Sequence, residues 1–255
     1  MALFLWMALA APVLAISSGD ALGVDSSPLI GIFSLPAPPF LCSSPGCEVI
    51  PASYVRSIES AGGQVVPIRL HSSHTEIEHL IKSLNGFLFT GGQDLDPSYA
   101  VHRVLNRSKE LFQAGVVLPV WGTCLGFEWL IASVAPDSLE VGFKSYNISL
   151  PLHPRLDAAP TSRLLGSAPL DIYEAMTLRN NTFNSHHRGI SPARWAQFPS
   201  LDKTFQVLST SFDLDGKEFV SVVEGVGGLP WFAVQWHPEK NTFEHGRNPD
   251  GTPFE

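Results

Sequence analysis

The fold is decided by the stretch at residues 116–126, VVLPVWGTCLG, which ends on a Gly-x-Cys-x-Gly turn centred on Cys124. The apolar run over 116–121 predicts a β-strand, and the helical pattern over 127–134 predicts a helix soon after the turn. Small residues on both sides of the cysteine permit a tight, strained turn that lifts the middle side chain out of a sheet. The stretch therefore predicts a reachable thiol between a strand and a helix.

Short apolar runs alternate with helical patterns through the first half of the chain. The runs at 29–33, 65–68 and 87–89 predict strands, and the i, i+4 spacing of apolar residues in 52–61 and 75–84 predicts helices. Such alternation builds a parallel sheet covered by helices. The predicted fold class is α/β, a three-layer sandwich with a mostly parallel central sheet.

The second half of the chain is more antiparallel in character. The runs at 205–208 and 219–223 predict a hairpin around residues 213–216, and the last apolar run, 231–236, leads directly into His237-Pro238-Glu239. A cysteine nucleophile needs a base, and the base needs a group that orients it. We assign these roles to His237 and Glu239, although the tripeptide taken alone is typical of a surface turn.

Two backbone segments are candidates for an oxyanion hole. Leu125 begins the helix after the cysteine, where N–H groups and the positive end of the helix dipole stabilise a thiolate and a developing oxyanion. Gly91-Gly92 follows the 87–89 run, at the carboxyl end of a strand, where α/β sheets bind ligands. An ordinary turn there, and a buried structural role for Cys124, are the alternatives. The glycine spacing does not fit a nucleotide fingerprint, so we predict no nucleotide.

The adjacent histidines His186 and His187 precede Arg188 in a polar segment that we expect to be a loop. No Cys/His or His/Glu pair recurs with the spacing of metal ligands, so we predict no metal and no cofactor. His187 and Arg188 are instead candidates for contact with an anionic substrate.

Composition excludes one function class and bounds the size of the fold. The 255-residue chain has a net charge of -8 and no basic patch, which opposes nucleic-acid binding. Its 44% hydrophobic and 16% charged residues are sufficient for a substantial core. We expect a single catalytic domain over residues 24–255.

Residues 1–15 form an apolar run that ends in small residues and is shorter than the ~20 residues of a membrane span. It is typical of a signal peptide, so we expect the secretory pathway and no stable membrane anchor. Three glycosylation sequons, at Asn106, Asn147 and Asn180, agree with that route. Cys42 and Cys47 could close a small disulfide loop there or remain two unpaired thiols, since spacing cannot establish the geometry.

Three segments together resemble the γ-glutamyl hydrolase family, within the class I glutamine amidotransferase-like fold. They are PVWGTCLGFE at 119–128, QWHPEK at 235–240, and the segment from Ser53 to Pro67 that begins SYVR. The similarity runs from about Pro28 to Asn241. The first string is far more specific than the cysteine turn that the whole superfamily shares.

The resemblance implies cleavage of folylpoly-γ-glutamates in a lysosome, a vacuole or outside the cell. By motif matching, the nucleophile, base and orienting acid fall on Cys124, His237 and Glu239. Gly92 and Leu125 would supply the oxyanion N–H groups, and His187 would correspond to a substrate-side histidine of the family.

One departure from the family concerns the chain after the His-Pro-Glu segment. Chains of this fold usually continue into a helix that packs on the sheet, whereas here a polar tail ends at Glu255, so we expect that C-terminal helix to be missing. Two other functions stay open: the glutaminase half of an amidotransferase, and an inactive relative that binds folate polyglutamates. The leader and sequons oppose the first, and the intact Cys124, His237 and Glu239 oppose the second. The oligomeric state also stays open, a homodimer included.

Overall fold

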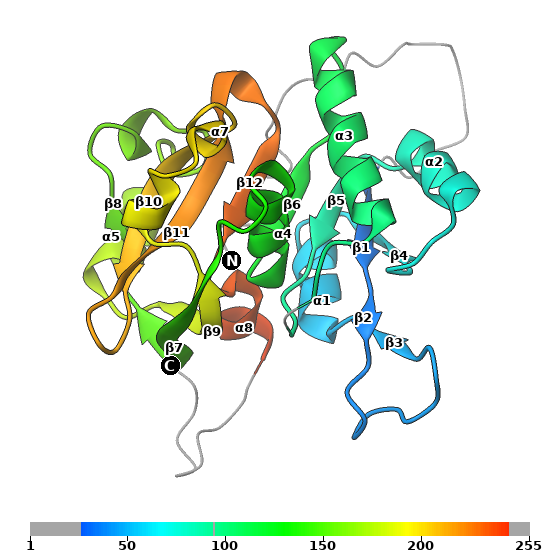
Figure 1. Cartoon of the computed structure of the whole chain (residues 1–255), viewed down its shortest axis with the longest axis horizontal. Coiled ribbons are helices and arrows are strands. Elements are labelled where there is room, and N and C mark those ends of the chain that lie inside the picture. The colour runs from blue at the N-terminus through cyan, green and yellow to red at the C-terminus, as the bar shows by residue number, and fades with distance from the viewer. Residues whose placement is uncertain (1–26, 94, 245–255) are drawn as a thin grey trace.

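The computed structural model describes residues 27–93 and 95–244 and centres on an eight-stranded sheet (Figure 1). In spatial order its strands are β4 (Gln64–Ile68), β1 (Leu29–Phe33), β5 (Gly86–Phe89), β6 (Val120–Thr123), β12 (Trp231–Val234), β11 (Glu218–Gly225), β10 (Phe205–Phe212) and β8 (His153–Pro154). The first five pair in parallel, and the remaining pairings are antiparallel. The predicted sheet and the predicted hairpin, now β10 and β11, are both present.

Helices cover both faces of the sheet, which gives the predicted three layers. One face carries α2 (His74–Ser83), α3 (Tyr99–Gln113), α4 (Leu125–Val134), α6 (Pro192–Trp195) and α7 (Pro199–Asp202), and the other carries α1 (Ala52–Ser60) and α5 (Leu170–Leu178). Strand β5 serves both layers, because Phe87 and Phe89 pack in the first hydrophobic cluster and Leu88 in the second. Both helices that the sequence predicted in this half, 52–61 and 75–84, match α1 and α2 within one residue at each end.

Two small sheets flank the main one. Strands β2 (Leu35–Pro36) and β3 (Glu48–Val49) carry between them the loop that the Cys42–Cys47 disulfide closes. Strands β7 (Glu140–Leu150) and β9 (Thr182–Gly189) pair antiparallel and were not predicted. The histidine pair at 186 and 187 lies in β9, so the prediction of a loop there was wrong. The segment is polar in sequence, but its backbone groups are hydrogen-bonded to β7.

The strand predicted over 116–121 starts later than expected. Val116 and Val117 are half exposed, and the N–H of Val116 donates to the carbonyl of Leu111, which completes the end of α3. Gly115 supports this helix end with φ of 79°. The apolar residues before β6 therefore belong to the connection from a helix, and β6 itself occupies Val120–Thr123.

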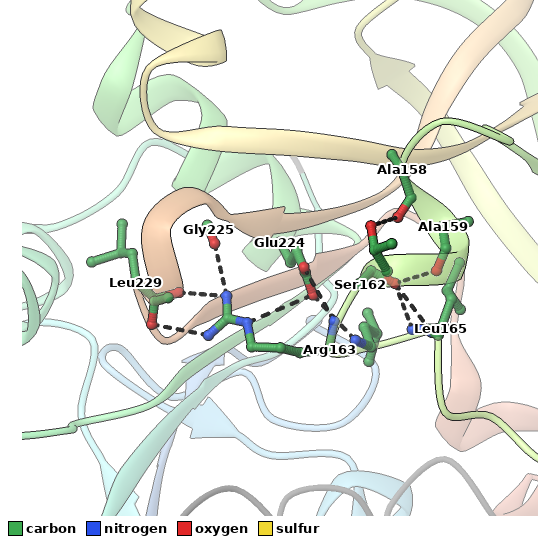
Figure 2. A network of polar contacts seen from close by, with 12 residues as sticks. Ala158, Ala159, Ser162, Arg163, Leu165, Glu224, Gly225 and Leu229 are labelled. Atoms are coloured by element: carbon green, nitrogen blue, oxygen red, sulfur yellow. Dashed lines mark hydrogen bonds and ion pairs between the residues drawn. The ribbon is translucent and has the colours of Figure 1, made fainter.

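A partly buried polar cluster connects the segment around η1 (Ala159–Thr161) to the turn between β11 and β12 (Figure 2). The guanidinium of Arg163 donates to the carbonyls of Gly228, Gly225 and Leu229 at 2.7–2.9 Å. Glu224 accepts from the backbone N–H groups of Arg163 and Leu164. These partners lie about 60 residues apart in the chain. The cluster therefore holds the N-terminal end of β12 in place, and His-Pro-Glu follows the other end of this strand.

The last described element is α8 (Pro238–Phe243), which packs against α1 below the sheet in Figure 1. No helix in the ranges 27–93 and 95–244 has the length and apolar character needed to cross a bilayer. The predicted leader, residues 1–15, and the predicted lack of a further C-terminal helix concern parts of the chain outside these ranges.

Candidate active site

Cys124 lies at the strained turn that its motif predicts. Its φ is 52°, an uncommon value for a residue with a side chain, and α4 begins at the next residue. The flanking glycines are required by close packing: a Cβ on Gly122 would lie 2.5 Å from the carbonyl oxygen of Gly126, and one on Gly126 would clash with the carbonyl of Phe89. The turn therefore presses α4 against β5 and β6.

The thiol is less accessible than the sequence suggested. Cys124 is the free cysteine and is only 3% exposed. Its N–H is bonded to the carbonyl of Val234 on β12, and its side chain is hydrogen-bonded to His237. The expectation of an exposed sulfur was wrong, because the side chain of Cys124 is buried against His237.

His237 and Glu239 are held together at the start of α8. The imidazole Nδ1 donates to Glu239 Oε1 at 2.7 Å, and both side chains are buried. The backbone N–H of His237 donates to the carbonyl of Phe183 in β9. Pro238 starts α8 directly after the histidine, and this short helix turns the carboxylate back toward the ring. The structure thus brings together the three residues to which the sequence assigned the chemistry.

The electrostatics of this group favour a charged imidazole. Burial alone would lower the pKa of His237, but the negative charges of Glu239 and Cys124 and the hydrogen bonds to both residues outweigh it and raise that pKa to about 10. At neutral pH the ring is therefore protonated on both nitrogens. Cys124 and His237 can form a thiolate–imidazolium pair that has a proton ready for a leaving group.

Tyr54 of α1 completes the site and was not singled out by the sequence. Its hydroxyl accepts from the N–H of Gly91 at 2.7 Å and lies 3.4 Å from His237 Nδ1. Burial, followed by the negative charges of Glu239 and Cys124, raises the pKa of Tyr54 well above its ordinary value, so the hydroxyl stays protonated and can donate a hydrogen bond to Glu239. The sequence feature that could have indicated this residue is a single tyrosine on the apolar face of the predicted helix.

The two predicted oxyanion segments are neighbours. A Cβ on Gly92 would lie 3.2 Å from Leu125 Cδ2, and the N–H of Gly126 donates to the carbonyl of Thr90 at 3.1 Å. Leu35 of β2 packs against Gly92 from the other side. The backbone after β5 and the start of α4 therefore lie side by side next to the sulfur.

A second polar group lies one helical turn from the cysteine. Glu128 Oε2 accepts from Arg188 Nε at 2.6 Å, and its Oε1 accepts from Gln235 Nε2 at 3.3 Å. Gln235 Oε1 is buried with no partner among the described residues. Arg188 was predicted as a site residue, whereas Glu128 and Gln235 were not. Each of these two is a charged or amide side chain inside an otherwise apolar segment, which is the sequence feature that could have indicated them.

Strand alternation separates the two adjacent histidines. His186 is buried and lies close enough to His237 for their charges to interact, whereas His187 is exposed on the other side of β9. Burial lowers the pKa of His186 to about 3, and its Nδ1 donates to the carbonyl of Arg188. This histidine is therefore neutral, and it was not the one that the sequence selected.

No cluster of three His, Cys, Asp or Glu residues suited to a metal ion occurs within the described ranges. The family of this chain follows from its sequence. The sequence profile of the Peptidase C26 family matches residues 28–239. The chain belongs to the Peptidase C26 family. The match spans the cysteine turn, the histidine and the glutamate described above.

Relatives of this Peptidase C26 chain include several γ-glutamyl hydrolases. It is 40% identical to the γ-glutamyl hydrolase of Mus musculus over 78% of this chain and 63% of that protein, and 33% identical to γ-glutamyl hydrolase B of Dictyostelium discoideum over 86% and 65%. The Homo sapiens γ-glutamyl hydrolase is 38% identical over 88% and 70%. The chain thus spans just under two thirds of the length of the first two relatives.

A solved structure supports the fold. The glutaminase domain of Trypanosoma brucei CTPS, determined with bound acivicin, superposes with a TM-score of 0.51 over 88% of this chain and 89% of that one, at 12% identity. At that identity the likeness concerns the fold alone. It confirms the glutamine amidotransferase-like arrangement expected for this Peptidase C26 chain.

Proposed function

We propose that the chain is a cysteine-type γ-glutamyl hydrolase that cleaves the γ-amide bonds of folylpoly-γ-glutamates. The observation that carries the proposal is the buried Cys124, His237 and Glu239 group at the carboxyl ends of β6 and β12. The names and identities of the relatives support the substrate class. The proposal needs no metal and no cofactor.

The proposed reaction is acyl transfer in two steps. The Cys124 thiolate attacks the γ-carbonyl carbon, and the N–H groups of Gly92 and Leu125 hold the oxyanion. The C–N bond breaks as His237 gives its proton to the departing amine, which leaves a γ-glutamyl thioester. Water then gives a proton to His237 and adds to the thioester, so that the γ-carboxylate is released and the thiolate returns. Glu239 and Tyr54 keep the imidazole in place throughout.

Recognition of the glutamyl group falls to the polar residues beside the sulfur. Arg188 is held by Glu128 at 2.6 Å, which places a guanidinium one helical turn from Cys124 as the candidate partner of a substrate carboxylate. The exposed His187 is the second candidate that the sequence offered for this role. A cationic side chain at this place suits the free α-carboxylate that each γ-linked glutamyl residue carries.

The direct test is glutamate release from a folate poly-γ-glutamate by the purified chain beside Cys124→Ala. We expect turnover in the wild type and a loss of at least about 10³-fold in the variant, because no other group supplies the nucleophile. Mass spectrometry of acid-quenched enzyme should find a γ-glutamyl adduct on the Cys124 peptide. A folded wild-type chain that leaves every γ-glutamyl substrate intact would refute the hydrolase.

Free glutamine in the same assay separates the alternatives. A glutaminase of the amidotransferase kind should release ammonia from glutamine faster than glutamate from the polyglutamate. Binding of the polyglutamate without turnover of either compound would instead favour an inactive binding relative. We expect the polyglutamate to be the better substrate.

We also propose that the chain passes through the secretory pathway as a glycoprotein. Asn106, Asn147 and Asn180 are exposed, and the Cys42–Cys47 disulfide suits an oxidising compartment. Expression in a secreting eukaryotic cell should give a protein whose mass falls on treatment with an N-glycosidase, and the triple Asn→Gln variant should not shift. An unglycosylated product retained in the cytosol would contradict this route.

A further inference from the structure

An open groove of about 400 Å³ lies beside the oxyanion segment. It is lined by Ser34, Glu48, Ile50, Pro67 and Arg69. Ser34 follows β1 and Arg69 follows β4, so the groove lies at the carboxyl edge of the sheet, the edge that also carries Cys124.

The distance from the sulfur suits a substrate that extends beyond one residue. β1 is two strands and β4 three strands from β6, which corresponds to roughly 10 and 14 Å at the spacing of neighbouring strands. Leu35, the residue after Ser34, packs on Gly92, so the groove and the oxyanion segment are in direct contact.

Of the two charged side chains that line the groove, Arg69 is the exposed one. The Glu48 carboxylate is mostly buried and already accepts from the hydroxyl of Ser34 and the N–H of Leu70, so it serves the protein rather than a ligand. The Arg69 side chain is 68% exposed, although its Nη2 donates to the carbonyl of Gly46 and its Nε faces Glu48 at 3.8 Å. These two contacts orient the guanidinium while leaving donors directed at solvent, in a chain whose net charge is -8.

We propose that this groove is a second substrate subsite, in which Arg69 binds the free α-carboxylate of a γ-linked glutamate remote from the scissile bond. The inference rests on the proposed hydrolase function. Each γ-linked glutamate is longer than the ~3.5 Å of an α-linked residue, because two methylene groups join the main chain. A second or third residue of the tail therefore spans the interval between the sulfur and Arg69.

The test compares substrates that carry one and several γ-linked glutamates, using Arg69→Gln. For the long substrate we expect KM to rise about tenfold, the effect of losing one hydrogen bond between charged groups, with kcat unchanged. For the short substrate both constants should stay at wild-type values. Arg155→Gln is the matched control, since Arg155 is an exposed arginine next to β8, the opposite edge strand of the sheet.

Binding to Cys124→Ala, measured by calorimetry with a poly-γ-glutamate, separates failure of the subsite from failure of the function. A wild-type chain without hydrolase activity would refute the proposed function, while loss of binding in the Cys124→Ala/Arg69→Gln double variant would still support the subsite. Equal effects of Arg69→Gln and Arg155→Gln would indicate general charge attraction and overturn the subsite. So would an effect of Arg69→Gln that is the same for long and short substrates.

Discussion

Gly91 is packed closely against the catalytic base His237. A Cβ at this position would lie 2.5 Å from His237 Cε1 and 2.7 Å from the Tyr54 hydroxyl. We predict that Gly91→Ala lowers kcat by about 100-fold, because displacement of a reacting group by ~1 Å is enough for such a loss. The rate at which iodoacetamide alkylates Cys124 should fall as well, which gives a measurement independent of the substrate.

Gly189→Ala is the control for this substitution. A Cβ there would meet Phe143 and Gln235 at 3.5 and 3.6 Å, which is ordinary van der Waals contact, so activity and melting temperature should change little. If Gly91→Ala were as active as Gly189→Ala, the close packing around His237 would have no role in the reaction.

Some residues of the site can be predicted from a local sequence pattern, and others reach the site only through the fold. Cys124 lies between glycines in a strand–turn–helix stretch, and His237 follows an apolar strand, so local sequence sufficed to select them. Tyr54 contacts His237 across 183 residues of chain, and Glu128 contacts Gln235 across 107. Such contacts depend on the topology of the fold. The spacing of residues in a single sequence does not predict them.

Among the elements, those with clean periodicity were predicted best. Strand β1 was predicted residue for residue, since it is a short apolar run bounded by turn residues. Strand β7 was missed because its alternation is interrupted twice, by register shifts next to Val141 and Tyr146, the second of which leaves Asn147 at φ of 60°. Helix α3 was missed as well, because its charged and polar residues obscure a narrow apolar stripe.

At the scale of the whole molecule, two buried histidines make the free energy of unfolding depend on pH in opposite directions. The pKa of His186 is lowered by burial to about 3, so between pH 6.5 and 3 the unfolded chain binds a proton that the folded chain does not. The pKa of His237 is raised to about 10 against its burial, chiefly by the charge of Glu239, so between pH 6.5 and 10 the folded chain holds the extra proton. The free energy of unfolding contributed by these groups is therefore largest near pH 6.5 and falls on both sides.

The acid side of this dependence can be removed with one substitution. Because His186 stays neutral in the folded chain, this residue should remove about 1.2 kcal/mol of unfolding free energy from the wild type between pH 6 and pH 5. In His186→Asn, whose amide can still donate to the carbonyl of Arg188, urea titrations at the two pH values should differ by less than half of that amount. His187→Asn, at the exposed neighbour, should keep the wild-type difference. A wild-type difference in His186→Asn would mean that the acid dependence arises elsewhere in the molecule.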